Sequence, residues 1–234
     1  LGFRRGDSRL RHDGQVWRLH HEGSDLVVPD VLIGRFNVFN LAAGALAAAA
    51  AGVPLPTALA RLRDLPPIPG RMEPCGTSPL TYVDYAHTAR SLALVVEALR
   101  ETHPGRRLVV VFGCGGDRDP GKRGPMGRAA MGADVAVVTN DNPRSESGAD
   151  IAGQIIAGTG AEAHWHRAGQ AVPADARLVV ELDRAAAIRL ARDLAGTDGV
   201  VAVCGKGHET EQIFADHREH FDDRAVVRGL EGGA

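Results

Sequence analysis

Charged and amide side chains follow an apolar segment at residues 137–144, where the sequence reads VVTNDNPR. Asp141 and Arg144 bracket Asn142 and Pro143, although a simple turn needs only the asparagine and the proline. A carboxylate beside a guanidinium can hold a zwitterion, with Asp141 near an ammonium group and Arg144 on a carboxylate. An Asn-Pro turn with a surface ion pair is the alternative, and the position after an apolar strand favours a ligand site.

A second polar segment, GCGGDRDPGKRG at residues 113–124, is rich in glycine and charge. Its glycines allow the backbone to approach a ligand closely, and the planar guanidinium of Arg118 suits a carboxylate or a phosphate. The segment matches neither the G-x-x-x-x-G-K-[ST] pattern nor the dinucleotide pattern G-x-G-x-x-G. A flexible solvated loop with local ion pairs is the alternative. Cys114 is the one thiol placed where a nucleophile would be expected.

A third segment, CGKGHETEQ at residues 204–212, places a lysine, a histidine and a glutamate after an apolar strand. One histidine with one glutamate offers too few donors at suitable spacing for a metal site, so no metal site is predicted. Glu209 is instead a candidate acceptor for an amine, and Gly205 allows close approach of the backbone. The alternative is a helix N-terminus with a capping acid.

Two further pairs of polar residues precede predicted helices. Asp84 and His87 follow another apolar strand, where Asp84 is a candidate to hold a ribose hydroxyl or a magnesium-bound water. Thr88 is a better cap than Asp84 for the next helix. Asn37 and Asn40 are three residues apart on one face of a helix start. Asn37 is predicted as the N-cap, and Asn40 is a candidate to contact a purine edge.

These polar segments need elements that bring them together. The periodicity predicts apolar strands at 80–85, 107–114, 134–140 and 199–205 with a short one at 161–166, and helices at 88–102, 124–133, 149–159 and 183–195. Continuous apolar strands separated by helices imply a mostly parallel sheet covered on both faces. With right-handed crossovers the fold class is α/β, Rossmann-like and doubly wound. Ligands bind beyond the carboxyl ends of such strands, where the polar segments lie.

The region before this alternation has a different pattern. Residues 1–33 are predicted to form short strands and turns, followed by a helix from about Asn37 that ends near Gly52. Thr57 is predicted as the N-cap of a second helix. The segment PPIPGR at 66–71 is typical of a hinge, so we predict domains at 1–68 and 69–234.

Composition excludes several classes of protein. The 234 residues carry a formal net charge of −2 and only 4% aromatic side chains, which argues against a nucleic-acid partner. The longest apolar run, from Leu41, is too short and too rich in alanine to span a bilayer, which argues against a membrane partner. Three widely spaced cysteines form neither a disulfide framework nor a zinc pattern and suit the reducing cytoplasm.

Several motifs in a fixed order carry a family resemblance: GRFNVFNLAA, GRME, VDYAHT, VVFGCGGDRDPGKR, TNDNPRSE, GKGHE and FDDR. They resemble the motifs of the Mur ligases, from about Gly34 to Arg224, and among these the members that add diaminopimelate. The resemblance implies an ATP-dependent amide ligase of peptidoglycan synthesis that uses Mg²⁺. Such ligases activate the D-Glu carboxylate of UDP-MurNAc-L-Ala-D-Glu as an acyl phosphate, which the amine of meso-diaminopimelate attacks.

The resemblance also implies roles for individual residues. The meso-diaminopimelate site would comprise Arg118, Asp141, Asn142, Pro143, Arg144, Gly205 and Glu209. Asn37 and Asn40 would lie near the adenine of ATP, and Arg71, Asp84 and His87 near its ribose and phosphates. Diaminopimelate has a second carboxylate that lysine lacks, so charged hydrogen bonds from the two arginines would distinguish the two amino acids.

Other family features have no counterpart in these 234 residues, namely a UDP-sugar domain, a GTxGKT phosphate loop and the lysine whose carbamylation helps to bind magnesium. The resemblance therefore implies that residues 1–68 are a remnant of the central ATPase domain and that 69–234 are the C-terminal domain. The expected partners are small molecules and a complementing N-terminal chain. The alternative is a catalytically inactive amino-acid- and nucleotide-binding fragment or paralogue. A third hypothesis, folylpolyglutamate synthetase, is disfavoured by DNPR together with GKGHE.

Overall fold

The computed structural model describes residues 3–5, 8–167 and 169–231. The chain divides into two compact units, Leu1–Pro67 and Ile68–Ala234, with the division inside the proline-rich segment at 66–71. The strands and turns predicted for residues 1, 2, 6 and 7 lie outside the described residues, as do residue 168 and the last three residues of the chain. Among the described residues, no helix has both the length and the apolar character needed to cross a membrane.

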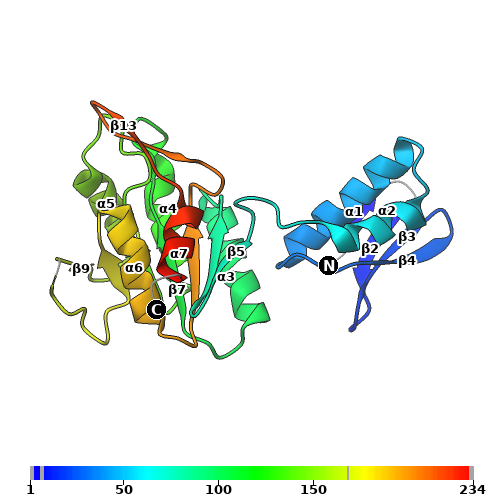
Figure 1. Ribbon diagram of the computed structural model, residues 1–234, viewed down its shortest axis with the longest axis horizontal. Coiled ribbons are helices and arrows are strands. Elements are labelled where there is room, and N and C mark those ends of the chain that lie inside the picture. Colours follow the sequence, from blue (N-terminus) through cyan, green and yellow to red (C-terminus); the bar gives the residue numbers. More distant parts are fainter. Residues whose placement is uncertain (1–2, 6–7, 168, 232–234) are drawn as a thin grey trace. The chain divides into compact units, whose positions relative to one another are not determined.

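The first unit consists of an antiparallel sheet and two helices (Figure 1). Its strands lie in the order β1 (Phe3–Arg5), β2 (Ser8–His12), β3 (Trp17–His21) and β4 (Ser24–Val28). Its helices are α1 (Arg35–Ala50) and α2 (Leu55–Arg61), followed by a short 3-10 turn, η1 (Leu62–Asp64). Leu10, Leu19 and Val28 from the sheet pack with Leu41 and Leu59 from the helices. Burial of apolar side chains from both kinds of element therefore forms the core of this unit.

The starts of both helices differ from the predictions. Helix α1 begins at Arg35 with Gly34 at the N-cap, so Asn37 lies inside the first turn and is not the cap. Helix α2 begins at Leu55, and Thr57 is likewise within the helix. Pro56 explains the earlier start of α2, because proline fits the first turn, where its missing N–H is not needed.

The second unit contains a seven-stranded, mostly parallel sheet (Figure 1). In spatial order its strands are β5 (Glu73–Thr77), β6 (Leu80–Asp84), β11 (Val200–Cys204), β7 (Leu108–Phe112), β8 (Val135–Val138), β10 (Leu178–Val180) and β9 (His164–Trp165). Only β5, at one edge, runs antiparallel to its neighbour among these strands. The predicted α/β, Rossmann-like sheet is therefore confirmed.

Helices cover both faces of this sheet. On one face, α4 (Arg123–Ala130) contacts both α3 (Ala89–Thr102) and α5 (Gly148–Ala157), and on the other α6 (Arg184–Ala195) packs beside α7 (Asp223–Glu231). A short 3-10 turn, η2 (Pro120–Lys122), precedes α4. Thr88 caps α3 by accepting a hydrogen bond from the Ser91 backbone N–H, as predicted. The core combines valines of β7, β8 and β11 with apolar residues of α6 and α7.

The sequence patterns did not predict β5, β10, α7 or the hairpin of β12 (Glu211–Ile213) and β13 (Arg218–His220). β10 has only three residues, and β5 contains a proline and a glycine, which strands usually exclude from their interior. Pro74 is tolerated because β5 lies at the edge of the sheet. Short elements of this kind are stabilised by tertiary pairing and not by local propensity.

Glu231, at the end of α7, should make stability depend on pH in the acid range. Its Oε2 accepts hydrogen bonds from the Thr77 backbone N–H at 3.0 Å and from Thr77 Oγ1 at 2.6 Å, and Arg192 pairs with Oε1. Hydrogen bonds from Thr77, with help from Arg192, lower the pKa of Glu231 from 4.5 to about 2. A lowered folded-state pKa stabilises the fold above the unfolded-state pKa, and this contribution is lost as pH falls toward 2.

We therefore expect Glu231→Gln to lower the free energy of unfolding by about 1–2 kcal/mol at pH 6, after allowance for solvent screening. The difference between variant and unmodified chain should shrink as pH falls from 4.5 to 2, because the carboxyl group then becomes protonated in both states. Urea unfolding at a series of pH values measures this. A difference that stays constant with pH would contradict the assignment.

Candidate functional site

Four polar segments converge at one edge of the second unit's sheet. They follow the carboxyl ends of β6, β11, β7 and β8, which are neighbours in this spatial order. Parallel strands place their carboxyl ends on the same side, and binding sites of open α/β sheets form there. The edge therefore brings together residues that are up to 125 positions apart in the sequence, from Asp84 to Glu209.

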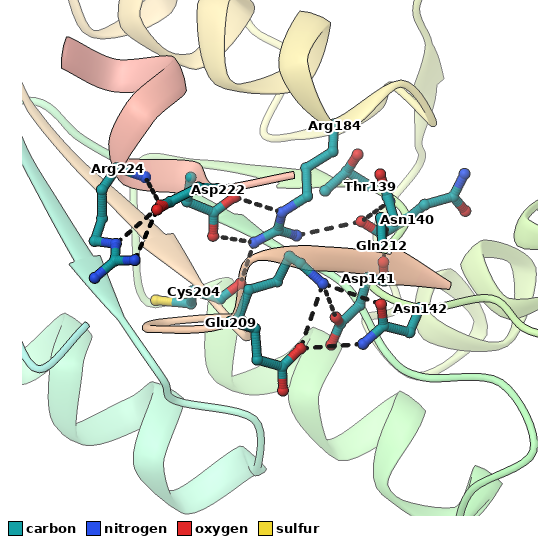
Figure 2. A network of polar contacts seen from close by, with 12 residues as sticks. Thr139, Asn140, Asp141, Asn142, Arg184, Cys204, Glu209, Gln212, Asp222 and Arg224 are labelled. Carbon is teal, nitrogen blue, oxygen red and sulfur yellow. Dashed lines mark hydrogen bonds and ion pairs between the residues drawn. The ribbon is translucent and has the colours of Figure 1, made fainter. Parts of the chain in front are cut away.

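The segments after β8 and β11 meet in a network of hydrogen bonds, drawn in Figure 2. Asn142 Nδ2 donates to Glu209 Oε2 at 3.2 Å. Asn142 Oδ1 accepts from Lys206 Nζ at 3.0 Å and from the Ile213 backbone N–H at 3.1 Å. The DNPR and GKGHE motifs are therefore parts of a single site, as their positions after apolar strands suggested.

Asp141 lies beside this network and is buried. Lys206 Nζ is 3.7 Å from its Oδ1, and this oxygen has no hydrogen-bond partner among the described residues. The Asp141 backbone carbonyl accepts a hydrogen bond from Gln212 Nε2 at 2.9 Å. Gly205 also approaches closely, since a Cβ there would lie 3.3 Å from Asp141 Oδ2. A buried carboxylate oxygen without a donor is costly, so it marks a place where a bound donor would add stability.

The two arginines of the predicted site are both near Gly115. A Cβ at Gly115 would lie 2.9 Å from Arg144 Nη1 and 3.6 Å from Arg118 Cγ. Arg118 is exposed, and its Nη1 donates to the carbonyl of Asp117 at 3.1 Å. Arg144 is half-buried, and its Nη1 donates to the carbonyl of Gly116 at 2.8 Å. Arg118 therefore offers the freer guanidinium, whereas Arg144 also supports the glycine loop.

Pro143 is buried, and its carbonyl oxygen lies against Gly116. A Cβ at Gly116 would be 1.8 Å from that oxygen, a separation that no side chain can adopt. The Gly116 backbone N–H donates to the carbonyl of Asn142 at 2.9 Å. The last glycine of GCGG, Gly116, is therefore required by the close approach of two loops, as the glycine content of the segment suggested.

Gly116→Ala should separate these two loops and disturb the site. We expect the free energy of unfolding to fall by about 2 kcal/mol or more, because the new methyl group displaces backbone and not a flexible side chain. Thermal unfolding of the variant measures the loss. Gly153→Ala is the matched control, since Gly153 lies in α5 with nothing within 4 Å of its hypothetical Cβ. The control should leave the free energy of unfolding equal or slightly higher. An equal loss in both variants would contradict the close contact between Gly116 and the Pro143 carbonyl.

A clamp of charged groups holds the same two loops together, and the sequence patterns did not single it out. Arg123, almost fully buried, donates to both carboxylate oxygens of Glu146 at 2.8 Å. Glu146 Oε1 accepts from the Asp117 backbone N–H at 2.6 Å, and Asp117 Oδ1 accepts from Ser145 Oγ at 2.6 Å. The hydrogen bonds from Ser145 lower the pKa of Asp117, and those from Arg123 lower the pKa of Glu146. Both carboxylates are therefore stabilised as anions.

A fully buried ion pair lies beside the site, and its Arg184 is labelled in Figure 2. Arg184 Nε donates to Asp223 Oδ1 at 2.7 Å and its Nη2 to Asp223 Oδ2 at 2.8 Å. The remaining donors reach the carbonyls of Cys204 at 3.0 Å and Asn140 at 3.2 Å. Burial alone would lower the pKa of Arg184, but attraction to Asp223 outweighs burial and raises it. The pair thus ties the ends of β11 and β8 together, just before GKGHE and DNPR.

The residues predicted near ATP fall into two groups. In the second unit, the Arg71 guanidinium lies 4.5 Å from the centre of the Tyr85 ring, and the His87 ring is 4.6 Å from the same ring. His208 of GKGHE contacts Tyr85 as well, at 5.3 Å between ring centres, although it was not among the predicted site residues. Arg71, His87 and His208 therefore all contact the Tyr85 ring.

Asp84 has a role within the fold. Its Oδ2 accepts from the Met72 backbone N–H and its Oδ1 from the Ala86 backbone N–H, both at 2.8 Å. Burial raises the pKa of Asp84. Asp84 thus fixes the backbone next to Arg71, and both carboxylate oxygens already have partners.

Asn37 and Asn40 belong to the first unit. Asn37 is buried, and its Nδ2 donates to the carbonyl of Ile33 at 2.7 Å. Asn40 is exposed and its Nδ2 donates to Asn37 Oδ1 at 3.4 Å. Asn37 therefore closes the loop before α1, and Asn40 presents the freer amide.

Neither a metal-binding cluster nor a reactive thiol is found among the described residues at this edge. Within the described ranges, no group of three or more His, Cys, Asp or Glu side chains is arranged to hold a metal ion. Cys114 is buried against Met126, with 3.6 Å between the sulfur atoms, and burial raises the pKa of its thiol to about 12. A thiol that remains protonated and inaccessible cannot act as a nucleophile.

Comparison with known proteins identifies the family. A model of the Mur ligase glutamate ligase domain matches residues 70–207, more than half of the chain. This chain belongs to the Mur ligase family. The matched region contains three of the four polar segments in full and the first four residues, 204–207, of the fourth. Mur ligases are ATP-dependent ligases, and the matched region corresponds to the glutamate ligase domain of the family.

Two similar proteins from different bacteria have the same enzyme name. The chain is 40% identical over 231 residues to a UDP-N-acetylmuramoyl-L-alanyl-D-glutamate–2,6-diaminopimelate ligase of Thermosynechococcus vestitus, covering 97% of this chain and 44% of that protein. It is 42% identical over 223 residues to a ligase of the same name from Geobacillus kaustophilus, covering 94% and 43%. This Mur ligase chain thus spans less than half the length of the curated relatives it matches.

Solved structures agree with the fold. A structure of a ligase of the same name is 36% identical, with a TM-score of 0.59, and the match covers 92% of this chain and 42% of that one. Folylpolyglutamate synthase of Mycobacterium tuberculosis complexed with ADP has a TM-score of 0.60 at 21% identity, covering 97% and 47%. At that identity the second match shows only the fold, so the substrate has to be argued from the site.

Proposed function

We propose that this chain is the amino-acid-binding part of an ATP-dependent ligase of peptidoglycan synthesis. The ligase would join meso-diaminopimelate to UDP-N-acetylmuramoyl-L-alanyl-D-glutamate. Relatives of that name at 40% and 42% identity, aligned over nearly the whole chain, support the proposal. The observation that carries it is the 3.2 Å hydrogen bond from Asn142 to Glu209, which joins DNPR and GKGHE in one polar site.

The chemistry of the site suits an amino acid with two charged ends. Glu209 is an acceptor for an ammonium group, and buried Asp141 has an oxygen without a hydrogen-bond donor among the described residues. Arg118, exposed at the rim with a single carbonyl contact, is suited to a carboxylate. L-Lysine has the same spacing between its two amino groups but lacks the second carboxylate, so it would leave that guanidinium without its anionic partner.

The residues of this chain would bind and orient the amino acid, so that its amine approaches an activated carboxyl group. ATP supplies the phosphoryl group that activates the carboxyl of the acceptor. Arg71 and His87 are suited to phosphate groups of ATP, Asp84 shapes the backbone beside Arg71, and Asn37 and Asn40 are proposed for the adenine side. Mg²⁺ enters the proposal through the family alone, since no donor set among the described residues is suited to it.

The proposal includes the organisation of the whole protein. Residues 1–68 would derive from the central ATPase domain and residues 69–234 would form the C-terminal domain of a cytoplasmic enzyme. A complementing N-terminal region would supply the phosphate loop and the site for the UDP-sugar. An inactive amino-acid- and nucleotide-binding module is the second candidate. If the isolated chain hydrolyses ATP, it does not need the complementing N-terminal region. The same result would refute the proposal of an inactive module.

Calorimetry of this chain with meso-diaminopimelate and with L-lysine tests the substrate. We expect meso-diaminopimelate to bind about 100-fold more tightly, because a polar site rejects an analogue that leaves its charged groups unpaired. Equal affinity for the two amino acids would refute the proposed specificity. Absence of binding to either amino acid would refute the amino-acid site itself.

A further inference from the structure

Lys206 contacts Asn142, Glu209 and Asp141 of the polar network, and none of the roles proposed above uses it. Its side chain is fully buried, with Nζ 3.0 Å from Asn142 Oδ1, 3.4 Å from Glu209 Oε2 and 3.7 Å from Asp141 Oδ1. A lysine is rarely buried unless it is paired. Three of the proposed amino-acid-binding residues are therefore also the partners of one internal cation.

The contact with Lys206 fixes the orientation of the Asn142 amide. Asn142 Oδ1 faces two groups that can only donate, the Lys206 ammonium and the Ile213 backbone N–H at 3.1 Å. A flipped amide would place its own N–H groups against these donors. The amide nitrogen must therefore point to Glu209 Oε2, as observed at 3.2 Å.

This arrangement leaves one oxygen of Glu209 available. Oε2 accepts from both Asn142 and Lys206, whereas Oε1 has no hydrogen-bond donor in the described part of the chain. The Glu209 side chain is 36% exposed, so a ligand can reach it. Oε1 is thus the acceptor that this network presents to a ligand.

Lys206 also balances the charge of the site. Asp141 and Glu209 are two anions, and one buried ammonium leaves a net charge of −1 in this cluster, which matches a single ammonium group of a ligand. Arg184 also lies near enough to interact with Asp141, but it is already paired with Asp223. Lys206 is therefore the cation that compensates the second carboxylate.

We propose that Lys206 is a positioning residue for the incoming amino acid. It holds Asn142 and Glu209 in the orientation that presents Glu209 Oε1 to a ligand ammonium, and it compensates the charge of Asp141. This assignment rests on the proposed function of the site as an amino-acid site. It adds a residue whose contact with the ligand is indirect, and it explains why a lysine is buried among residues that bind an ammonium.

Lys206→Met, which keeps the length of the side chain without its charge, tests the proposal by calorimetry with meso-diaminopimelate. We expect binding to weaken at least tenfold. Without the cation, one of the two carboxyl groups should hold its proton to higher pH, so affinity should fall more steeply from pH 8 to pH 6 than in the unmodified chain. Lys122→Met, at the chain's other lysine, is the control and should stay within twofold.

A measurement without ligand tests the role of Lys206 independently of the proposed amino-acid binding. Solvent exchange of the Asn142 side-chain amide protons, followed by NMR, should be at least tenfold faster in Lys206→Met. If the unmodified chain binds no meso-diaminopimelate, the proposed function fails and this exchange rate still decides the role of Lys206. A folded Lys206→Met variant with unchanged exchange, or with unchanged affinity and pH profile in a binding chain, would overturn the proposal.

If Lys206→Met does not fold, the single variant Asp141→Asn and the double variant Asp141→Asn/Lys206→Met test the proposal instead. Asp141→Asn combined with Lys206→Met removes one anion and one cation together, so the net charge of the cluster is unchanged. Compared with Asp141→Asn alone, the double variant should show faster Asn142 exchange and at least fivefold weaker binding of meso-diaminopimelate. Equal exchange rates in the two variants would show that Lys206 serves stability alone and would overturn the positioning role.

Discussion

Replacing Asp223 with alanine should lower the free energy of unfolding by about 3–5 kcal/mol, since it leaves a buried arginine without its counter-ion. Both side chains of the Arg184–Asp223 pair are fully buried. The carbonyls of Cys204 and Asn140 would remain as partners of Arg184, but neither carries a full negative charge. Urea unfolding at pH 7 measures the loss.

The matched control for this variant is Asp216→Ala. Asp216 lies in the same C-terminal region and pairs with His217 at 2.7 Å, but its side chain is 87% exposed. An exposed ion pair contributes little, so the control should leave stability nearly unchanged. A loss of less than about 1 kcal/mol in Asp223→Ala, or similar losses in both variants, would contradict the structural role of the buried pair.

Arg118→Ala should weaken the binding of meso-diaminopimelate by about 10- to 100-fold, which corresponds to about 1.5–3 kcal/mol for hydrogen bonds to a charged group. Its guanidinium is exposed near Arg144 and has only a carbonyl partner, so its removal should hardly affect the fold. The loss should be confined to the amino acid with the second carboxylate. L-Lysine affinity should stay within about threefold, so the preference between the two amino acids should largely disappear.

Arg128→Ala is the matched control for this prediction. Arg128 lies in the last turn of α4, is exposed, and donates to the carbonyl of Gly158 at 3.0 Å, so it resembles Arg118 in exposure and partner but belongs to another part of the unit. Calorimetry should find its affinity for meso-diaminopimelate unchanged. If Arg118→Ala loses affinity for both amino acids equally, Arg118 does not contact the second carboxylate.

Much of the fold and the neighbourhood of the site could be predicted from local patterns. Runs of valine in β7, β8 and β11 predicted strands buried on both faces, and all three are buried along their whole length. Thr88 predicted the start of α3 because a threonine side chain can satisfy the first free N–H groups of a helix. Polar segments after apolar strands predicted one common edge, because the carboxyl ends of parallel strands face the same way.

Other features could not be predicted, because they depend on contacts between distant residues. Asp223 lies 39 positions from Arg184, and no local pattern indicates that the two are paired. The sequence placed Lys206 in a polar segment after an apolar strand and gave no sign that its side chain is fully buried. Asn37 was expected to cap a helix, but the helix begins two residues earlier, and its amide bonds to Ile33 instead.

The sequence by itself determined the family, the α/β class and the chemistry of each segment, because motif order, apolar periodicity and side-chain type are local properties. The tertiary structure decided how these segments are combined. β11 lies between β6 and β7 although it comes last in the parallel sheet, so GKGHE reaches DNPR across the glycine loop. Strand order depends on how the helices pack on the sheet, so it cannot be predicted from the local apolar periodicity. For this reason the partners of Asn142, and the buried lysine among them, became visible only in the folded chain.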